Sequence, residues 1–97
     1  MKRSDAIHLI QDHKIELHDR YPISVLYLFG SVARDEAQSD SDIDLLVEFY
    51  KPVGLFEFIA LQQELERILG CKVDLGTPRS IKMQLKEDIM QEAIRVA

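Results

Sequence analysis

Seven residues, Ile23 to Phe29, limit most strongly the folds that this chain can adopt. The run is apolar almost throughout and rich in β-branched and aromatic side chains, which is typical of a buried central strand. Gly30 and Ser31 follow at once, and they predict that the strand ends there and that a short helical turn begins. A buried strand needs neighbouring strands and covering helices, so the run favours a layered fold.

Periodicity predicts the other elements. Strand-like alternation places Ile43, Leu45, Val47 and Phe49 on one face and Asp42, Asp44, Leu46 and Glu48 on the other. A short third strand is expected over 72–76. Helices are expected over 4–19 with Ser4 as N-cap, over 55–69 before Gly70, and after Ser80 with Ile81, Leu85, Ile89 and Ala93 on one stripe. We therefore predict a single α/β domain over 1–97, in which helices flank a small sheet.

Composition excludes several functions. Seventeen acidic and twelve basic residues give a net charge of −5, which argues against binding duplex nucleic acid. The lone cysteine, Cys71, excludes an intrachain disulfide and a cysteine-rich zinc site. No apolar run is long enough to span a membrane, and no signal-peptide core follows the basic N-terminus, so we expect a cytoplasmic protein.

Asp42 and Asp44 are the first candidates for chemistry. Residues two apart in a strand share a face, which puts the two carboxylates on one side, roughly 7 Å apart along the chain. One interpretation is that they belong to a solvated strand face. The other is a Mg²⁺ site, because a divalent cation relieves the repulsion and prefers hard oxygen ligands.

Gly30, Ser31 and Asp74 extend this pattern. A glycine at a strand-to-helix turn allows backbone N–H groups to approach a phosphate, although a glycine needed for its backbone angles, with serine as N-cap, is an equally simple explanation. Asp74 lies in a short apolar strand, where an isolated acid is often a turn residue. If its strand adjoins the strand of Asp42 and Asp44, the three carboxylates converge, and one can accept a proton from an attacking hydroxyl.

Two segments together carry a family resemblance: Gly30-Ser31-Val32-Ala33-Arg34 and Ser41-Asp42-Ile43-Asp44-Leu45-Leu46-Val47. The chain resembles the nucleotidyltransferase superfamily that includes DNA polymerase beta, from about Tyr21 onward. Its short length and the details of both segments are similar to those of the minimal (MNT) members. Many of these are antitoxins paired with HEPN-domain ribonuclease toxins. The resemblance implies the nucleotidyltransferase fold, with a small mixed sheet.

The resemblance also implies roles for individual residues. Gly30, Ser31 and Arg34 would bind the nucleotide, and Asp42, Asp44 and Asp74 would ligate two Mg²⁺ ions, with Asp74 also acting as the base. The implied reaction transfers AMP from ATP to a tyrosine hydroxyl of a HEPN toxin, which would make the chain a type VII-like antitoxin able to form a hetero-oligomer with that toxin. Ser41 would steady the loop before Asp42, and for Arg34 a solvated surface role stays open.

One residue departs from the family pattern. Asp35 stands where family members often have glycine after the Ala-Arg pair. Aspartate tolerates a left-handed backbone better than most residues, but its charge would weaken binding of a triphosphate nearby. Two alternatives also stay open: an antitoxin that neutralises its partner by contact alone, and a transferase acting on a small molecule such as an aminoglycoside.

Overall fold

The architecture is a four-stranded mixed sheet with helices on both faces. The computed structural model describes residues 1–38, 42–80 and 83–97. The elements are α1 (Arg3–Asp12), α2 (Lys14–Arg20), β1 (Ile23–Phe29), α3 (Gly30–Ala33), β2 (Ile43–Phe49), α4 (Leu55–Leu69), β3 (Val73–Gly76), the short 3₁₀ helix η1 (Pro78–Ser80), α5 (Met83–Glu92) and β4 (Ile94–Arg95). The predicted α/β fold is confirmed, and the helix expected after Ser80 begins at Met83; Ser41 and Ile81 lie outside the described residues.

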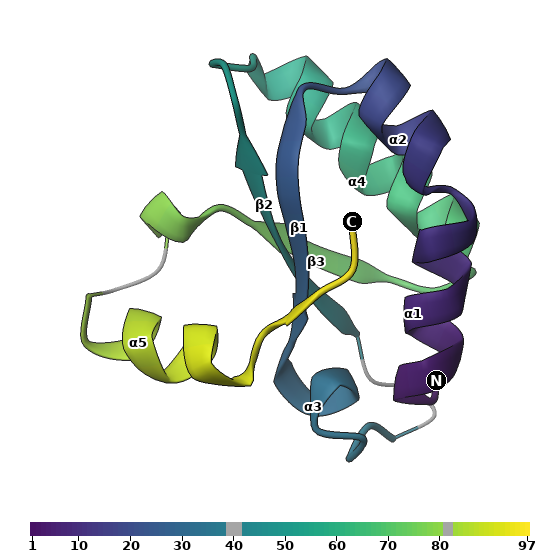
Figure 1. Cartoon of the computed structure of the whole chain (residues 1–97), viewed down its shortest axis with the longest axis vertical. Helices are drawn as coiled ribbons and strands as arrows, with labels where there is room; N and C mark the ends of the chain where they lie inside the picture. The colour runs from purple at the N-terminus through teal and green to yellow at the C-terminus, as the bar shows by residue number, and fades with distance from the viewer. Residues whose placement is uncertain (39–41, 81–82) are drawn as a thin grey trace.

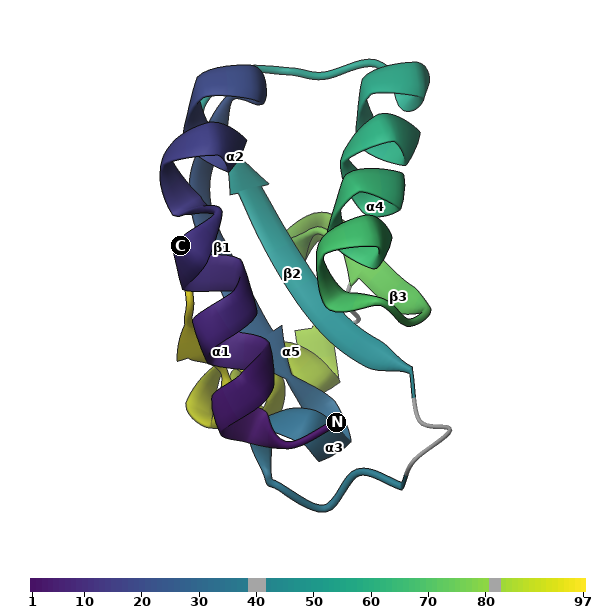
Figure 2. The same ribbon diagram turned by 90° about the vertical axis from the view of Figure 1, so that its right-hand side faces the viewer.

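The strand order is β3-β2-β1-β4. β1 runs antiparallel to both β2 and β4, whereas β2 and β3 are parallel. Helices α1, α2 and α4 cover one face of this sheet, and α5 lies on the other side (Figures 1 and 2). The main core fills the space under the three helices, with fully buried residues such as Ile10, Leu28, Leu45 and Leu65. The second face carries the acidic residues of β2 and β3.

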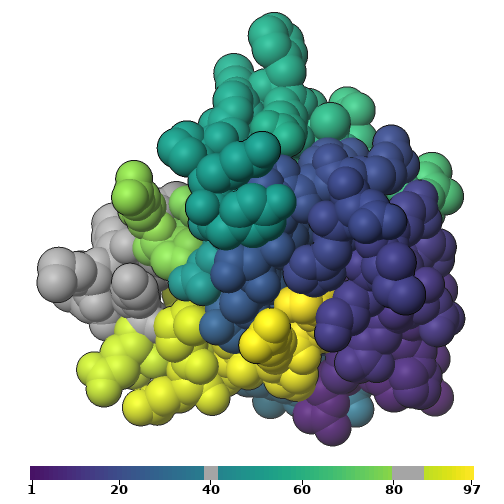
Figure 3. Space-filling model, turned by 45° about the horizontal axis from the view of Figure 1, so that its top comes forward, coloured from purple at the N-terminus to yellow at the C-terminus, as the bar shows by residue number. Residues whose placement is uncertain are grey.

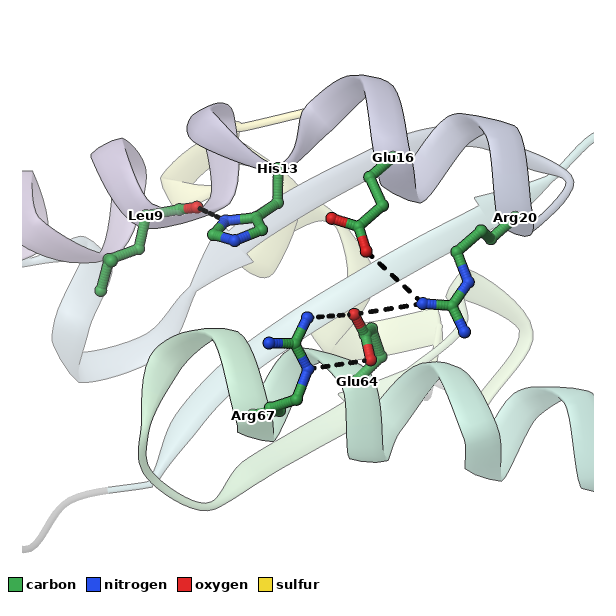
Figure 4. Close-up of polar contacts among 6 residues, drawn as sticks. All are labelled: Leu9, His13, Glu16, Arg20, Glu64 and Arg67. Carbon is green, nitrogen blue, oxygen red and sulfur yellow. Dashed lines mark hydrogen bonds and ion pairs between the residues drawn. The ribbon is translucent and has the colours of Figure 1, made fainter.

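The helix expected over 4–19 is interrupted at His13. The His13 ring donates through Nδ1 to the Leu9 carbonyl at 2.8 Å, while the His13 backbone N–H turns to the Ile10 carbonyl at 3.0 Å (Figure 4). The imidazole thus occupies the Leu9 carbonyl, to which the His13 backbone N–H would donate in a continuous helix. The first helix ends there, and α2 follows. The predicted Ser4 cap is also wrong, because α1 begins at Arg3 with Lys2 as N-cap.

Helix α4 follows its predicted bounds and is tied to α2. Gly70 ends it in the left-handed conformation, with φ of 69°, as expected. Glu64 of α4, whose side chain is only 12% exposed, accepts from Arg67 and from Arg20 of α2, which also reaches Glu16 (Figure 4). Glu64 therefore bridges two of the three helices that cover the core.

The C-terminal residues form a strand that the apolar periodicity does not predict. Ile94 and Arg95 pair with Leu28 and Tyr27 of β1, and Val96 and Ala97 are buried beside Leu26. The expected helical stripe through Ala93 therefore ends at Glu92. Within the described part of the chain, none of the helices combines the length and the apolar character needed to cross a membrane.

Candidate active site

The turn that ends β1 lies directly against Asp44. Gly30 has φ of +74°, and a Cβ built on it would lie 3.0 Å from Asp44 Cγ and well within van der Waals contact distance of Oδ2. Glycine is required here both for its backbone angles and because the carboxylate fills the space of a side chain. Ser31 is not the N-cap; Phe29 occupies that position, without a side-chain cap.

Strand register brings the predicted acidic residues together. Asp44 pairs with Phe29 of β1 on one side and with Asp74 of β3 on the other. Paired residues on neighbouring strands are about 4.8 Å apart and project from the same face. Asp42 is exposed and immediately precedes β2. The structure therefore places the Asp44 carboxylate against the Gly30 turn, with Asp74 in register on β3 and Asp42 just before β2. We refer to Asp42, Asp44 and Asp74 as the acid row.

The acid row is electrostatically strained at its centre. Asp44 is half-buried, whereas Asp42 and Asp74 are exposed. Burial raises the pKa of the Asp44 carboxyl, and the negative charges of Asp74 and then Asp42 raise it further, while Arg34 acts in the opposite sense. A positive charge placed here would stabilise the ionised form of all three groups.

Side chains of α4 hold β3 in place next to Asp74. Gln62 Nε2 donates to the Val73 carbonyl at 3.0 Å, and the Val73 N–H donates to Glu66 Oε2 at 3.0 Å. These bonds satisfy backbone groups on the outer side of an edge strand. Sequence reasoning missed both residues, because Gln62 and Glu66 look like ordinary polar positions of an amphipathic helix.

Arg34, the predicted phosphate contact, is held by two acidic residues. Its Nε donates to Glu36 at 3.2 Å, and its Nη1 donates to Glu92 of α5 at 3.0 Å. The guanidinium is exposed, yet close enough to Asp44 to lower the pKa of that carboxyl. Arg34 therefore lies near the acid row, while its predicted role toward the nucleotide stays a prediction.

Asp35 adopts the left-handed backbone that the family's glycine would suit, with φ of 59°. Its Oδ1 accepts from the backbone N–H of Arg3 at 3.1 Å, and Arg3 Nη1 reaches the Ala33 carbonyl at 3.4 Å. The carboxylate thus lies at the first residue of α1, where a negative charge is stabilising. Asp35 ties the N-terminal helix to the segment that follows the Gly30 turn.

Metal ligation stays a prediction. Among the described residues, no three His, Cys, Asp or Glu side chains are gathered closely enough to hold a metal ion. The acid row offers carboxylate oxygens, which are the kind of donor that Mg²⁺ prefers. Rotation of the side chains would bring carboxylates on adjacent strands together. It is the backbone register that supports the site.

Comparison with protein families gives one match that covers most of the chain. The model described as "Nucleotidyltransferase domain" matches residues 10–96. Among curated proteins, the chain is 38% identical over 88 residues to protein adenylyltransferase MntA of Thermococcus cleftensis, covering 91% of this chain and 89% of that protein.

Solved structures show the same fold. A minimal nucleotidyltransferase superposes with a TM-score of 0.80 and 34% identity, covering 97% of this chain and 95% of that one. A chain of a toxin–antitoxin structure with AMP-PNP gives a TM-score of 0.73 and 26% identity, over 90% of this chain and 72% of that one. A tri-AMPylated HEPN toxin of Shewanella oneidensis in complex with MNT antitoxin provides a third match, with a TM-score of 0.67 and 26% identity, over 94% and 71%.

Replacing Gly30 with alanine should lower the free energy of unfolding by at least about 2 kcal/mol, because a non-glycine residue is strained at positive φ and its Cβ must displace Asp44. Urea denaturation followed by circular dichroism measures the change. Gly54→Ala is the control: Gly54 has φ of −78° and nothing within 4 Å of an added Cβ, so its cost should stay under about 1 kcal/mol. Equal costs would show that the contact with Asp44 is unimportant.

Substitutions of Asp35 should rank in stability as Asn, then Gly, then Ala. Asparagine keeps both the tolerance for positive φ and the oxygen that accepts from Arg3, glycine keeps only the backbone, and alanine keeps neither, at a cost of about 2 kcal/mol. The same urea titration measures the series. A glycine variant as stable as the natural chain would mean that the hydrogen bond to Arg3 contributes nothing.

Asp44→Asn should stabilise the chain at neutral pH when measured in chelator. Folding raises the pKa of Asp44, so the folded state binds its proton more tightly and stability falls as pH rises from about 3.9 through the folded-state pKa. Asparagine removes that loss, and its advantage should shrink as pH is lowered toward 4. Thermal melts at several pH values, with exposed Asp12→Asn as control, test this; an advantage that is independent of pH would contradict the raised pKa.

Proposed function

Given that this chain belongs to the nucleotidyltransferase domain family, we propose that it transfers AMP from ATP to a tyrosine hydroxyl of a HEPN-domain toxin. The observation that carries the proposal is the acid row beside the Gly30 turn, with Asp44 and Asp74 in register on adjacent strands. The resemblance to minimal members drawn from the sequence is confirmed by the matched relatives.

The Gly30 turn is suited to the triphosphate. Gly30 and Ser31 would contact its phosphates from the end of β1, since no side chain at residue 30 stands in the way. Arg34 would offer its remaining guanidinium donors to a phosphate while Glu36 and Glu92 hold the other two. The repulsion expected between Asp35 and the triphosphate is weakened, because the Asp35 carboxylate faces the N-terminus of α1.

The reaction breaks one phosphoanhydride bond and forms one phosphoester bond. The acceptor oxygen forms a bond to the α-phosphorus of ATP, and the bond from that phosphorus to the bridging oxygen breaks, releasing pyrophosphate. Asp74, exposed at the edge of the acid row, would take the proton of the acceptor hydroxyl. Asp42, Asp44 and Asp74 would hold two Mg²⁺ ions, which when bound neutralise the triphosphate and the charge of the departing pyrophosphate.

A protein acceptor fits the chain's charge and its relatives. A net charge of −5 disfavours a polynucleotide acceptor. The matched relative is named a protein adenylyltransferase, and one matched complex contains an AMPylated HEPN toxin. We therefore propose that the reaction takes place within a toxin–antitoxin pair, with ATP as the donor, and we expect it to occur in the cytoplasm.

Replacing both Asp42 and Asp44 with asparagine should reduce AMP transfer by about 100-fold or more, because the Mg²⁺ ions that would neutralise and orient the triphosphate lose two of their carboxylate ligands. The assay combines α-labelled ATP, Mg²⁺ and a HEPN-family protein, taken from the adjacent gene if that gene encodes one, and follows AMP on that partner by intact mass. The control replaces Asp12 and Asp19, both exposed, with asparagine and so removes the same charge from α1 and α2.

The outcomes separate the three candidate functions. Transfer by the natural chain and the control, but not by the acid-row variant, supports the proposal. A tight complex without transfer would favour neutralisation by contact alone. Transfer to an aminoglycoside but not to the partner would favour the small-molecule enzyme.

A further inference from the structure

Exposed apolar side chains gather at one end of the molecule. Among the described residues, five large hydrophobic side chains are exposed, and four come from residues 50–59: Tyr50 at 68%, Leu55 at 71%, Phe56 at 89% and Ile59 at 39%. These four form what we refer to as the apolar patch. Figure 3 shows this segment, in teal, standing out at the top of the molecule. So dense a group on a small domain indicates an interaction surface.

A hollow adjoins this patch. It has a volume of about 640 Å³ and shares Tyr50 with the patch; its walls include Ser24, Glu48, Lys51, Pro78 and Arg79. The end of β2 and the turn after it form one wall of the hollow, and η1 forms the other. In Figure 3 the wall formed by η1 lies beside the teal segment. Two cations and one acid line it, so the hollow is net positive on a chain whose total charge is −5.

The hollow lies on the same face of the sheet as the acid row. Asp44, Leu46 and Glu48 alternate with core residues along β2 and therefore share that face. Glu48 is four residues from Asp44, which is roughly 13 Å along a strand. The hollow is thus within reach of a protein that occupies the acid row. The patch continues from the hollow, through Tyr50, around the end of β2 onto α4.

Interface size allows that contact for a protein acceptor. A specific interface covers about 800 Å² on each partner, a surface roughly 30 Å across. The whole chain measures 32 × 31 × 19 Å. A partner that presents a hydroxyl to Asp74 can therefore also cover the hollow and reach the patch that adjoins it.

Charge argues against a second copy of this chain as the occupant. A two-fold dimer places the same surface on both sides, so Lys51 and Arg79 of one copy would approach those of the other. Two molecules of charge −5 would also repel each other. A different protein with acidic side chains around an apolar anchor satisfies both the cations and the patch.

We propose that the apolar patch and its hollow dock the protein that carries the acceptor hydroxyl, through an apolar anchor flanked by acidic side chains. This inference rests on the proposed function and adds to it the surface that selects the partner. Docking lowers the concentration of acceptor needed for transfer and leaves the chemistry at the acid row unchanged.

Phe56→Glu should raise the dissociation constant for the HEPN-family partner at least tenfold, since it puts a charge in the centre of the patch. Ile15→Glu is the matched control, because Ile15 is 80% exposed but lies on α2, outside the patch. A second variant, Lys51→Glu with Arg79→Glu, should weaken binding similarly through the hollow. Calorimetric titration measures the binding of the partner and of ATP, and ATP binding should be unchanged in all variants.

Activity gives an independent measurement. AMP transfer to dilute partner should fall tenfold in Phe56→Glu, while transfer to a short tyrosine-containing peptide at millimolar concentration should match that of Ile15→Glu. Equal partner affinity in Phe56→Glu and Ile15→Glu would overturn the inference. So would a natural chain that sediments as a dimer and becomes a monomer on Phe56→Glu with its partner affinity intact.

The same experiment separates this inference from the proposed function. If the natural chain transfers AMP to neither acceptor but loses partner affinity on Phe56→Glu, the docking surface stands and the proposed activity fails. If it transfers AMP to both with no difference among the variants, the activity stands and the docking surface fails.

Discussion

The carboxylate of Asp44 occupies the space that a side chain at residue 30 would need. This one contact joins the end of β1 to the start of β2, because only a glycine with positive φ allows the turn and the carboxylate to lie so close. The contact fixes where the chain leaves the sheet, and therefore where α3, Arg34 and Asp35 lie relative to the acid row. The rest of the site depends on this absence of a side chain.

Local patterns were sufficient to predict the two long strands. Alternation along 42–49 and the apolar run of 23–29 are properties of neighbouring residues, so β1 and β2 follow from them, with Asp44 on the face away from the core. Asp42 precedes β2, and the face it shares with Asp44 stays a prediction. Asp35 does adopt a left-handed backbone, which aspartate tolerates better than most residues. Asp74 was predicted to converge with Asp42 and Asp44 only if its strand adjoins β2. The parallel pairing of β2 with β3 meets that condition.

Contacts between distant residues could not be predicted in this way. Arg34 is held by Glu92, which is 58 residues away, and Val73 is held by Gln62 and Glu66 from across a helix. The break at His13 depends on a ring nitrogen competing for a backbone carbonyl, and β4 is a two-residue strand with no periodicity to detect. Each of these features is decided by tertiary geometry, which helical or strand periodicity does not encode.

The hydrogen bonds from α4 to Val73 also have a consequence for how the sheet meets other chains. Only alternate residues of an edge strand turn their N–H and C=O outward, and β3 has four residues, so once Val73 is paired at most one outward pair is left. Such an edge is too short to recruit a strand from another polypeptide. The domain is thereby protected from edge-to-edge aggregation along β3, and a partner that meets this edge must recognise it through side chains instead of adding a strand there.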